Sequence, residues 1–291
     1  MSESPRDIFG DWRKSVSGNI AYSLMRHLRD TALSMRGVAV NAQKYRLPLG
    51  VVFKIDEIWM SEVIEKILPH TKGIFLDIGV NLGQTLLSLR SVDKRRSYLG
   101  FEPNVDCVSV VRKIIRLNEI SHCVIIPAAC SGQFGIARLF HYLDSDFDSS
   151  ASMLPNFRDV RARRGETTIA VASVHESLTA MGVERVGIVK IDVEGFEADV
   201  LEALEMVLAR DRPFVIIEVL PVMESTSRMH ATTRISALLA RLGYISFEIV
   251  KDEHGNLRDF REVACMGAQK EVQSSDFLLS PVSTLPITSS K

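Results

Sequence analysis

The sequence predicts an α/β fold with a Rossmann-like, doubly wound and mostly parallel sheet. Two observations support this class. From residue 73 onward, short apolar runs of strand length alternate with segments that have the period of amphipathic helices. Acidic residues and glycines end several of the apolar runs and so limit them to strand length. Strands that alternate with helices form a mostly parallel sheet with helices on both faces.

The composition is that of a globular protein and excludes several classes. The chain has 291 residues, of which 46% are hydrophobic and 24% charged, enough for one large domain with a small appendage. Its 35 Lys and Arg residues balance 36 Asp and Glu residues, so it lacks the basic excess of proteins that hold long nucleic acid duplexes. The four cysteines have no CxxC spacing, which argues against a zinc site. With no signal peptide and no apolar run of about 20 residues, we expect a cytoplasmic protein without a membrane span.

Residues 1–70 are expected to form an N-terminal helical extension or cap. Apolar residues at helical spacing over 19–36 stop at Gly37, and a short extended stretch lies around 49–53. Asp56 can then cap a second helix that Pro69 ends. These amphipathic stripes fit ordinary packing, a cap on a site or a dimer contact.

The main domain is expected over residues 71–280, followed by a flexible tail at 281–291. Five apolar runs are predicted as parallel strands: 73–77, 98–102, 123–127, 185–192 and 214–219. Helices are predicted at 84–90, after Asn104, at 196–209 and at 231–242, and late strands at 245–250 and 277–280.

One segment, residues 131–174, breaks the alternation. Strand-like runs at 136–142 and 168–174 enclose a long polar loop, so we predict an inserted β-hairpin. The loop is expected to cover a bound substrate. Its hydroxyl and amide side chains could bind a polyhydroxylated molecule (Ser149, Ser150, Ser152 and Asn156). Its arginines could hold a phosphate, but we favour the interpretation that they belong to a solvated loop (Arg158, Arg161, Arg163 and Arg164).

The turn after the first strand, IFLDIGVNLGQT, lies where an open parallel sheet binds ligands. Its glycines stand at 79 and 83, with Gln84 where a dinucleotide fingerprint would place its last glycine, so that fingerprint fails. Asp77 would repel a pyrophosphate but would suit the ammonium of an amino acid. S-adenosylmethionine carries that ammonium and lacks phosphate, so this turn favours it over a dinucleotide.

Acidic residues end three further predicted strands. Glu102 lies 25 residues after Asp77, where a carboxylate can accept hydrogen bonds from ribose hydroxyls. Asp192 and Glu194 follow the fourth strand in VKIDVEG, and Glu218 ends the fifth. Carboxylates gathered at one edge of a sheet could bind a cation, orient a hydroxyl group or accept its proton.

The segments IFLDIGVNLGQT, YLGFEPN, KIDVEGFEADVL and FVIIEV, in this order and spacing, resemble the FkbM family of class I S-adenosylmethionine-dependent methyltransferases. The resemblance covers about residues 74–280. It implies an antiparallel last strand at 276–279 and O-methylation of sugars, polyketides or other natural products. It also implies a set of cofactor residues: Asp77, Gly79, Asn81 and Gly83 toward methionine, Glu102 toward ribose, Ala129 toward adenine, and in addition Gln84, Asn104 and Asp192.

We therefore expect an S-adenosylmethionine-dependent O-methyltransferase with a small-molecule or glycan acceptor. The sequence is compatible with a homo-oligomer. Asp192 is the candidate base, with Glu194 and Glu218 as supporting acids or metal ligands; His141 and His230 are weaker alternatives. No separate metal site is assigned, and the acids are compatible with a reaction with or without Mg²⁺. The alternatives are an NAD-dependent oxidoreductase or epimerase, and a non-catalytic S-adenosylmethionine-binding module.

Overall fold

A computed structural model describes residues 36–40, 42–48, 57–155, 157–220, 226–264, 266, 276–282 and 285. The helix expected at 19–36 falls outside them except for its last residue, as do Asp56, Asn156 and most of the predicted tail. Among the described helices, none has the length and apolar character needed to cross a membrane.

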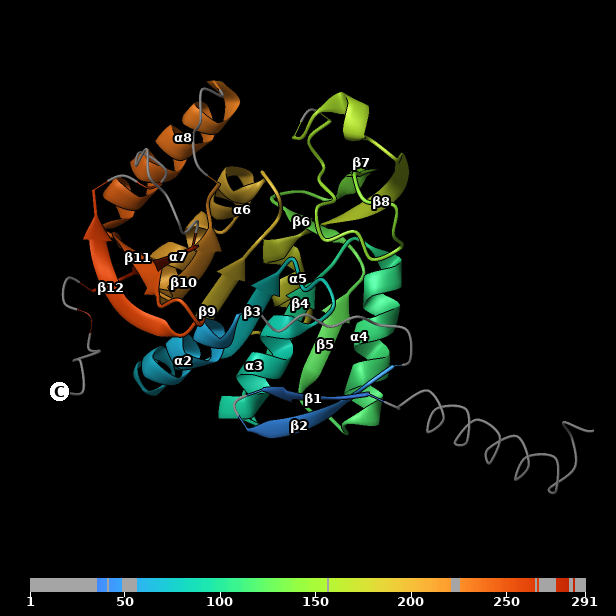
Figure 1. Cartoon of the computed structure of the whole chain (residues 1–291). Coiled ribbons are helices and arrows are strands. Elements are labelled where there is room, and N and C mark those ends of the chain that lie inside the picture. The colour runs from blue at the N-terminus through green and yellow to red at the C-terminus, as the bar shows by residue number, and fades with distance from the viewer. Residues whose placement is uncertain are drawn as a thin grey trace, which may run out of the picture.

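An eight-stranded sheet forms the centre of the molecule (Figure 1). Its strands lie in the order β12 (Leu257–Val263), β11 (Ile245–Lys251), β13 (Asp276–Ser280), β10 (Phe214–Glu218), β9 (Val186–Ile191), β3 (Ile74–Ile78), β4 (Tyr98–Phe101) and β5 (Cys123–Ile126). The five strands from β10 to β5 are parallel, and β13 is antiparallel to both neighbours. The predicted fold class, including the antiparallel last strand, is therefore confirmed.

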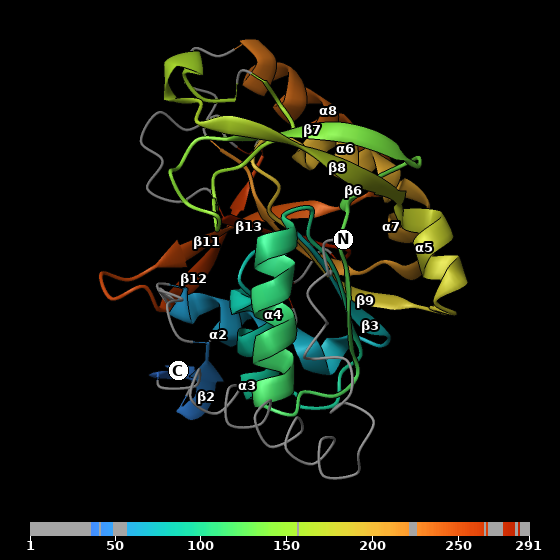
Figure 2. The same cartoon turned by 90° about the vertical axis from the view of Figure 1, so that its right-hand side faces the viewer.

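Helices cover both faces of this sheet (Figures 1 and 2). On one face α2 (Ile58–Ile67), α3 (Gln84–Val92) and α4 (Val105–Leu117) bury their apolar stripes. On the other lie α5 (Val174–Ala180), α6 (Glu197–Ala203), α7 (Glu205–Asp211) and α8 (Thr226–Leu242). Between these layers every residue of β9 is buried, which explains why its sequence VGIVKI is apolar almost throughout.

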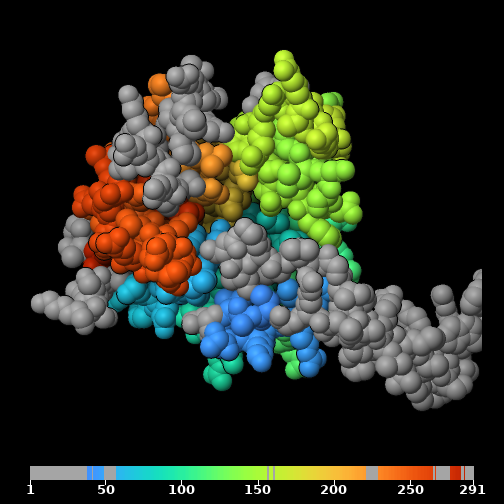
Figure 3. Space-filling model, viewed as in Figure 1, coloured from blue at the N-terminus to red at the C-terminus, as the bar shows by residue number. Residues whose placement is uncertain are grey.

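The insertion is a three-stranded sheet rather than a simple hairpin. β8 (Gly165–Ser173) pairs antiparallel with β7 (Gly135–His141) and parallel with the short strand β6 (Ala129–Ser131). In the space-filling view the insertion stands out as a lobe of its own (Figure 3).

Residues 36–47 form a hairpin that the sequence patterns did not indicate. β1 (Arg36–Val40) and β2 (Gln43–Leu47) pair antiparallel. The apolar side chains of this hairpin, among them Tyr45 and Leu47, pack with Leu82 and with residues of α3 and α4. The hairpin therefore supports the turn between β3 and α3 from outside.

Arg90, on α3, ties together two loops at the amino-terminal edge of the sheet. Its side chain is buried and its guanidinium donates to four backbone carbonyls, those of Asp93, Arg96, Ser121 and His122, at 2.9–3.3 Å. These carbonyls lie in the loops that lead into β4 and β5. One cation thus supplies the hydrogen-bond donors that the loop backbone needs in the absence of water.

We expect Arg90→Met to lower the free energy of unfolding by about 3 kcal/mol, because several carbonyls lose a charged donor. Urea unfolding measures this as a lower midpoint at unchanged slope. Arg95→Met is the control, since Arg95 is exposed on the same loop and should change stability by less than about 0.5 kcal/mol. Equal midpoints for the two variants would contradict the role of Arg90.

Candidate functional site

The carboxyl ends of three neighbouring strands meet in register. Ile78 of β3 pairs with Ile191 of β9 on one side and with Phe101 of β4 on the other. The residues that follow these three strands are Gly79, Asp192 and Glu102, so the alignment places them at one point of the sheet edge. This point lies between β3 and β9, where the strand order reverses and open α/β sheets bind their ligands.

The glycine turn passes against the backbone of Asp192. Gly79 has φ +93°, and a Cβ atom on it would lie 1.8 Å from the Asp192 carbonyl oxygen. The N–H groups of Gly79 and Val80 both donate to the Phe101 carbonyl. Only glycine fits this conformation and this distance, so the sequence signal at position 79 has a direct steric cause.

Lys190 is a residue that the sequence patterns left without a role. Its ammonium is buried and donates to the Gly79 carbonyl at 3.0 Å and to Asp192 Oδ2 at 3.1 Å. It also lies 3.9 Å from Asp77 Oδ1. Lys190 precedes Asp192 by two positions on a strand, so both side chains leave the same face; this spacing could have indicated the pair.

Asp77 lies beneath the site and is fully buried. Its Oδ2 accepts a hydrogen bond from the Tyr98 hydroxyl, and its Oδ1 has no hydrogen-bond partner. Burial raises the pKa of Asp77 to about 6, although Lys190 and the Tyr98 hydrogen bond both favour its charged form. Asp77 therefore acts on the site through Lys190 and Tyr98, and Tyr98 was not singled out from the sequence.

Glu102 is held by two backbone groups. Its Oε2 accepts from the Asn81 N–H at 2.7 Å and its Oε1 from the Asn104 N–H at 2.8 Å. Burial raises the pKa of Glu102 to about 7 against these two hydrogen bonds, which lower it. Each carboxylate oxygen keeps a further lone pair, so the fixed carboxyl can accept hydrogen bonds from a ribose diol.

A pocket opens above these strand ends. Its lining includes seven of the predicted site residues: Gly79, Asn81, Glu102, Asn104, Ala129, Asp192 and Glu194. Asp77, Gly83, Gln84 and Glu218 are not among its lining residues, so their proposed contacts with a ligand stay predictions. Its apolar lining includes Phe101, Pro103, Leu139 and Met153. A pocket lined by both carboxylates and apolar side chains fits a cationic amino acid joined to an adenosine.

Asp192 and Glu194 lie at the same pocket but differ in their surroundings. Asp192 is partly exposed and paired with Lys190. Glu194 lies in the left-handed region at φ 51°, and its side chain is 18% exposed and 3.5 Å from Arg158. Desolvation, assisted by Asp192 and Glu218, raises the pKa of Glu194 to about 8. Glu194 is thus the carboxyl of the pair that can take up a proton near neutral pH.

Most of the loop side chains that were predicted to bind a ligand make contacts with other residues of the protein. The Ser150 hydroxyl bonds Asp148 and the Ser152 hydroxyl donates to the Glu194 carbonyl at 2.6 Å, whereas Ser149 lines the pocket. The arginines disperse: Arg163 stacks on Phe140 and pairs with Glu166, Arg158 reaches Glu194, and Arg161 and Arg164 are exposed. They do not gather into one phosphate site.

Neither histidine considered as a base lines the pocket. His141 lies 3.0 Å from the Thr167 hydroxyl and 3.8 Å from Asp148 Oδ2, and His230 is exposed on α8. Among the described residues, no group of three or more His, Cys, Asp or Glu side chains could hold a metal ion.

Comparison with known protein families gives a match over residues 77–246, more than half of the chain, to the methyltransferase FkbM domain. The chain belongs to the FkbM methyltransferase family. As a member, it is an S-adenosylmethionine-dependent methyltransferase, and the residues of the pocket fit that cofactor. The alternative of an NAD-dependent enzyme has no support from this match. No curated protein matches the sequence significantly.

Solved structures of similar fold include methyltransferases at low sequence identity. A methyltransferase FkbM from Methylobacillus flagellatus KT aligns at 13% identity and TM-score 0.45, over 72% of this FkbM-family chain and 43% of that protein. An O-methyltransferase from Bacillus cereus in complex with SAH aligns at 11% identity and TM-score 0.43, over 80% and 83% of the two chains. A putative O-methyltransferase from Klebsiella pneumoniae aligns at 12% identity and TM-score 0.42, over 90% and 96%. The chain thus spans less than half of the length of the Methylobacillus protein.

We expect Lys190→Met to lower the free energy of unfolding by about 3 kcal/mol, because Asp77 and Asp192 lose the cation between them. The loss should be larger at pH 8 than at pH 5, since protonation of Asp77, whose pKa is raised to about 6, removes the uncompensated charge. Urea unfolding at both pH values measures it.

The Asp77→Asn, Lys190→Met double variant is the control for this interpretation. It should recover part of the lost stability at pH 8, because the buried carboxylate is gone together with its partner. A loss in Lys190→Met that is the same at both pH values and is not recovered would contradict the charge pairing.

Proposed function

We propose that this methyltransferase O-methylates a hydroxyl group on a sugar, glycan, polyketide or other natural-product acceptor. The observation that carries the proposal is the Glu194 carboxyl at the pocket, with a pKa raised to about 8. A hydroxyl group needs a base when its oxygen is methylated, and a base is most effective with a pKa near the working pH. The cofactor, when bound, supplies a methyl group activated by a sulfonium.

Asp192 and Glu194 take different roles in this proposal. The Lys190 ammonium donates to Asp192 Oδ2 at 3.1 Å, so this carboxylate is engaged by a cation and is proposed as a partner for the cofactor ammonium rather than as the base. Glu194 orients the acceptor hydroxyl and accepts its proton. Asp192 and Glu102 would hold the cofactor, from which the methyl group would pass to the acceptor oxygen, with S-adenosylhomocysteine as the other product.

The insertion fixes the backbone around Glu194, and this supports the proposal that Glu194 is a positioned base. Ser152 bonds the Glu194 carbonyl, and a Cβ on Gly195 would lie 2.6 Å from the Phe157 ring and 2.9 Å from Leu154. Such close packing fixes the backbone that carries Glu194, and correct orientation of reacting groups is worth several kcal/mol of barrier in model reactions. Glu218 acts at longer range by raising the pKa of Glu194.

The cofactor assignment predicts binding of S-adenosylmethionine and S-adenosylhomocysteine, measured by isothermal calorimetry on the purified chain. Transfer of a labelled methyl group to a panel of sugars, nucleotide sugars and polyketide alcohols then tests the acceptor class. Binding of NADH without binding of S-adenosylhomocysteine would overturn the assignment. Transfer only to amine acceptors would overturn the O-methyl proposal.

The role of Glu194 predicts a pH profile. With an acceptor from that panel, kcat/KM should rise about tenfold per pH unit below pH 8, because the base must be unprotonated, and then level off. Arg158→Ala should move this limb to higher pH, since Arg158 lowers the pKa of Glu194.

Glu194→Gln is the direct test of the same role. It should reduce kcat by at least about 10²-fold, yet change the affinity for S-adenosylhomocysteine by less than about threefold. If kcat/KM still falls in the same way below pH 8 in Glu194→Gln, another group accepts the proton.

A further inference from the structure

The apolar end of the cofactor pocket has two walls of different origin. One is the segment after β5, with Ala129 and Cys130. The other comes from the loop between β7 and β8, with Ala151 and Met153. Ala129, Ala151 and Met153 also belong to the small apolar core of the insertion, which is built around Leu139 and Ile169. The insertion and this end of the pocket are therefore one packed unit.

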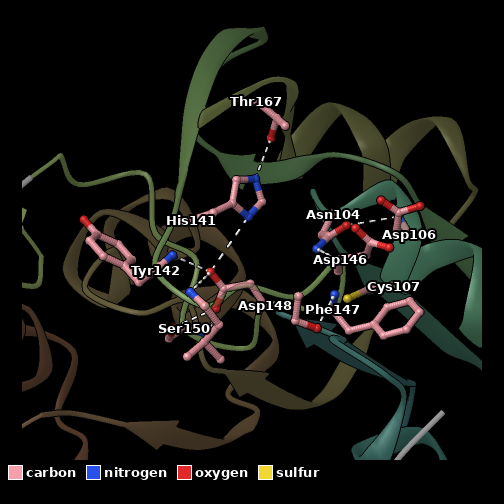
Figure 4. A network of polar contacts seen from close by, with 12 residues as sticks. Asn104, Asp106, Cys107, His141, Tyr142, Asp146, Phe147, Asp148, Ser150 and Thr167 are labelled. Carbon is pink, nitrogen blue, oxygen red and sulfur yellow. Dashed lines mark hydrogen bonds and ion pairs between the residues drawn. The ribbon is translucent and has the colours of Figure 1, made fainter. Parts of the chain in front are cut away.

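Asp148 is the centre of that loop. Its carboxylate is fully buried, and both oxygens are occupied. Oδ2 accepts from the N–H groups of Tyr142 and Leu143 at 2.6 and 3.0 Å, and Oδ1 accepts from the N–H and hydroxyl of Ser150 at 2.9 and 2.7 Å. Figure 4 shows these contacts converging on one side chain. Asp148 thus fixes the path of the loop and has few acceptor positions left for a ligand.

Asn104 connects the loop to the ribose end of the pocket. Its Nδ2 donates to the Asp146 carbonyl at 2.9 Å, and its Oδ1 accepts from the Asp106 N–H and caps α4 (Figure 4). Its own N–H donates to Glu102. The residue that positions the ribose carboxylate therefore also ties down the loop. Both atoms of the Asn104 amide are used in this way, although the sequence predicted a contact with the cofactor.

A second tie lies at the other end of the loop. Ser152 pairs through its backbone with Phe140 of β7, at 2.8 and 3.1 Å, and through its hydroxyl with the Glu194 carbonyl. The loop is thus held at Asn104, at β7 and at Glu194, and two of these, Asn104 and Glu194, line the pocket.

We propose that residues 148–153, four of which line the pocket, form the outer wall of the adenine subsite, and that Asp148 and Asn104 are positioning residues for it. The proposal rests on the assigned cofactor. The strand ends at Gly79 and Asp192, the Glu102 carboxyl and the apolar side chains of Ala129 and Met153 all line this one pocket. A ligand with its amino acid at Asp192 and its ribose at Glu102 therefore has its planar base between the two apolar walls. The insertion serves the cofactor, whereas the sequence had placed it over the acceptor.

Two ligands separate this role from a role at the methionine end. S-adenosylhomocysteine carries both adenosine and an amino acid, whereas 5′-methylthioadenosine carries the adenosine alone. In Asp148→Asn, an NH₂ group takes the place of one carboxylate oxygen and faces the N–H groups that this oxygen had accepted from. The hydrogen bonds that fix the loop are lost on that side, so the wall is disturbed. We expect calorimetry to show about tenfold weaker binding of both ligands. Asp192→Asn should weaken S-adenosylhomocysteine only, and Asp144→Asn, an exposed acid of the same loop, should bind both as the wild type does.

Asn104→Ser tests the tether independently of Asp148. A serine oxygen can still cap α4, but the donor to the Asp146 carbonyl is lost. We expect at least threefold weaker binding of both ligands and faster hydrogen exchange in residues 143–151 with S-adenosylhomocysteine bound. If Asp148→Asn does not fold, this variant decides the question.

The outcomes distinguish this proposal from the cofactor assignment. If the wild-type protein binds both ligands and the affinities are unchanged in Asp148→Asn and Asn104→Ser, the proposed adenine wall is wrong. The cofactor assignment would then still stand. If these variants lose S-adenosylhomocysteine binding but keep full binding of 5′-methylthioadenosine, the loop lies at the methionine end of the pocket. This result would also contradict the proposed adenine wall. A wild-type protein that binds neither ligand would overturn the cofactor assignment and the wall with it.

Discussion

The ammonium of Lys190 is the interaction on which the site depends. It lies where β3 and β9 end and bonds both the glycine turn and Asp192. Without a cation at this point, Asp77 and Asp192 would bring two like charges together in a poorly solvated place. The residues above it, from Gly79 to Glu102, take their positions from the strand ends that Lys190 joins. One buried cation thus lets an acidic ligand site form at the edge of an apolar sheet.

The parts of the fold that follow from periodicity could be predicted from the sequence. Central strands such as β9 are continuous apolar runs because helices cover both of their faces. β12 was missed because it lies at the edge of the sheet, where most of its side chains are half-buried or exposed and the sequence LRDFREV has no apolar run. The hairpin of β1 and β2 was missed for a similar reason, since its apolar residues are few and its partners on α3 and α4 are distant in sequence.

The site, too, has residues that could be predicted from the sequence and residues that could not. Gly79, Glu102 and Asp192 were predicted because each directly follows a strand, and strand ends can be identified locally. Asp148 gave no such signal, because its role arises only when a loop folds around it and closes on Asn104. The difference between Asp192 and Glu194 also lies beyond sequence, since it depends on which of the two carboxylates the Lys190 ammonium reaches.

The two buried cations, Arg90 and Lys190, lie toward opposite edges of the same sheet. Arg90 satisfies carbonyl groups at the amino-terminal edge, and Lys190 balances carboxylates at the carboxyl-terminal edge. Dissolved ions screen exposed charges over a distance of about 10 Å at moderate ionic strength, but they act far less on buried pairs. The framework of the site, which these buried contacts hold, should therefore keep its geometry from dilute buffer to concentrated salt.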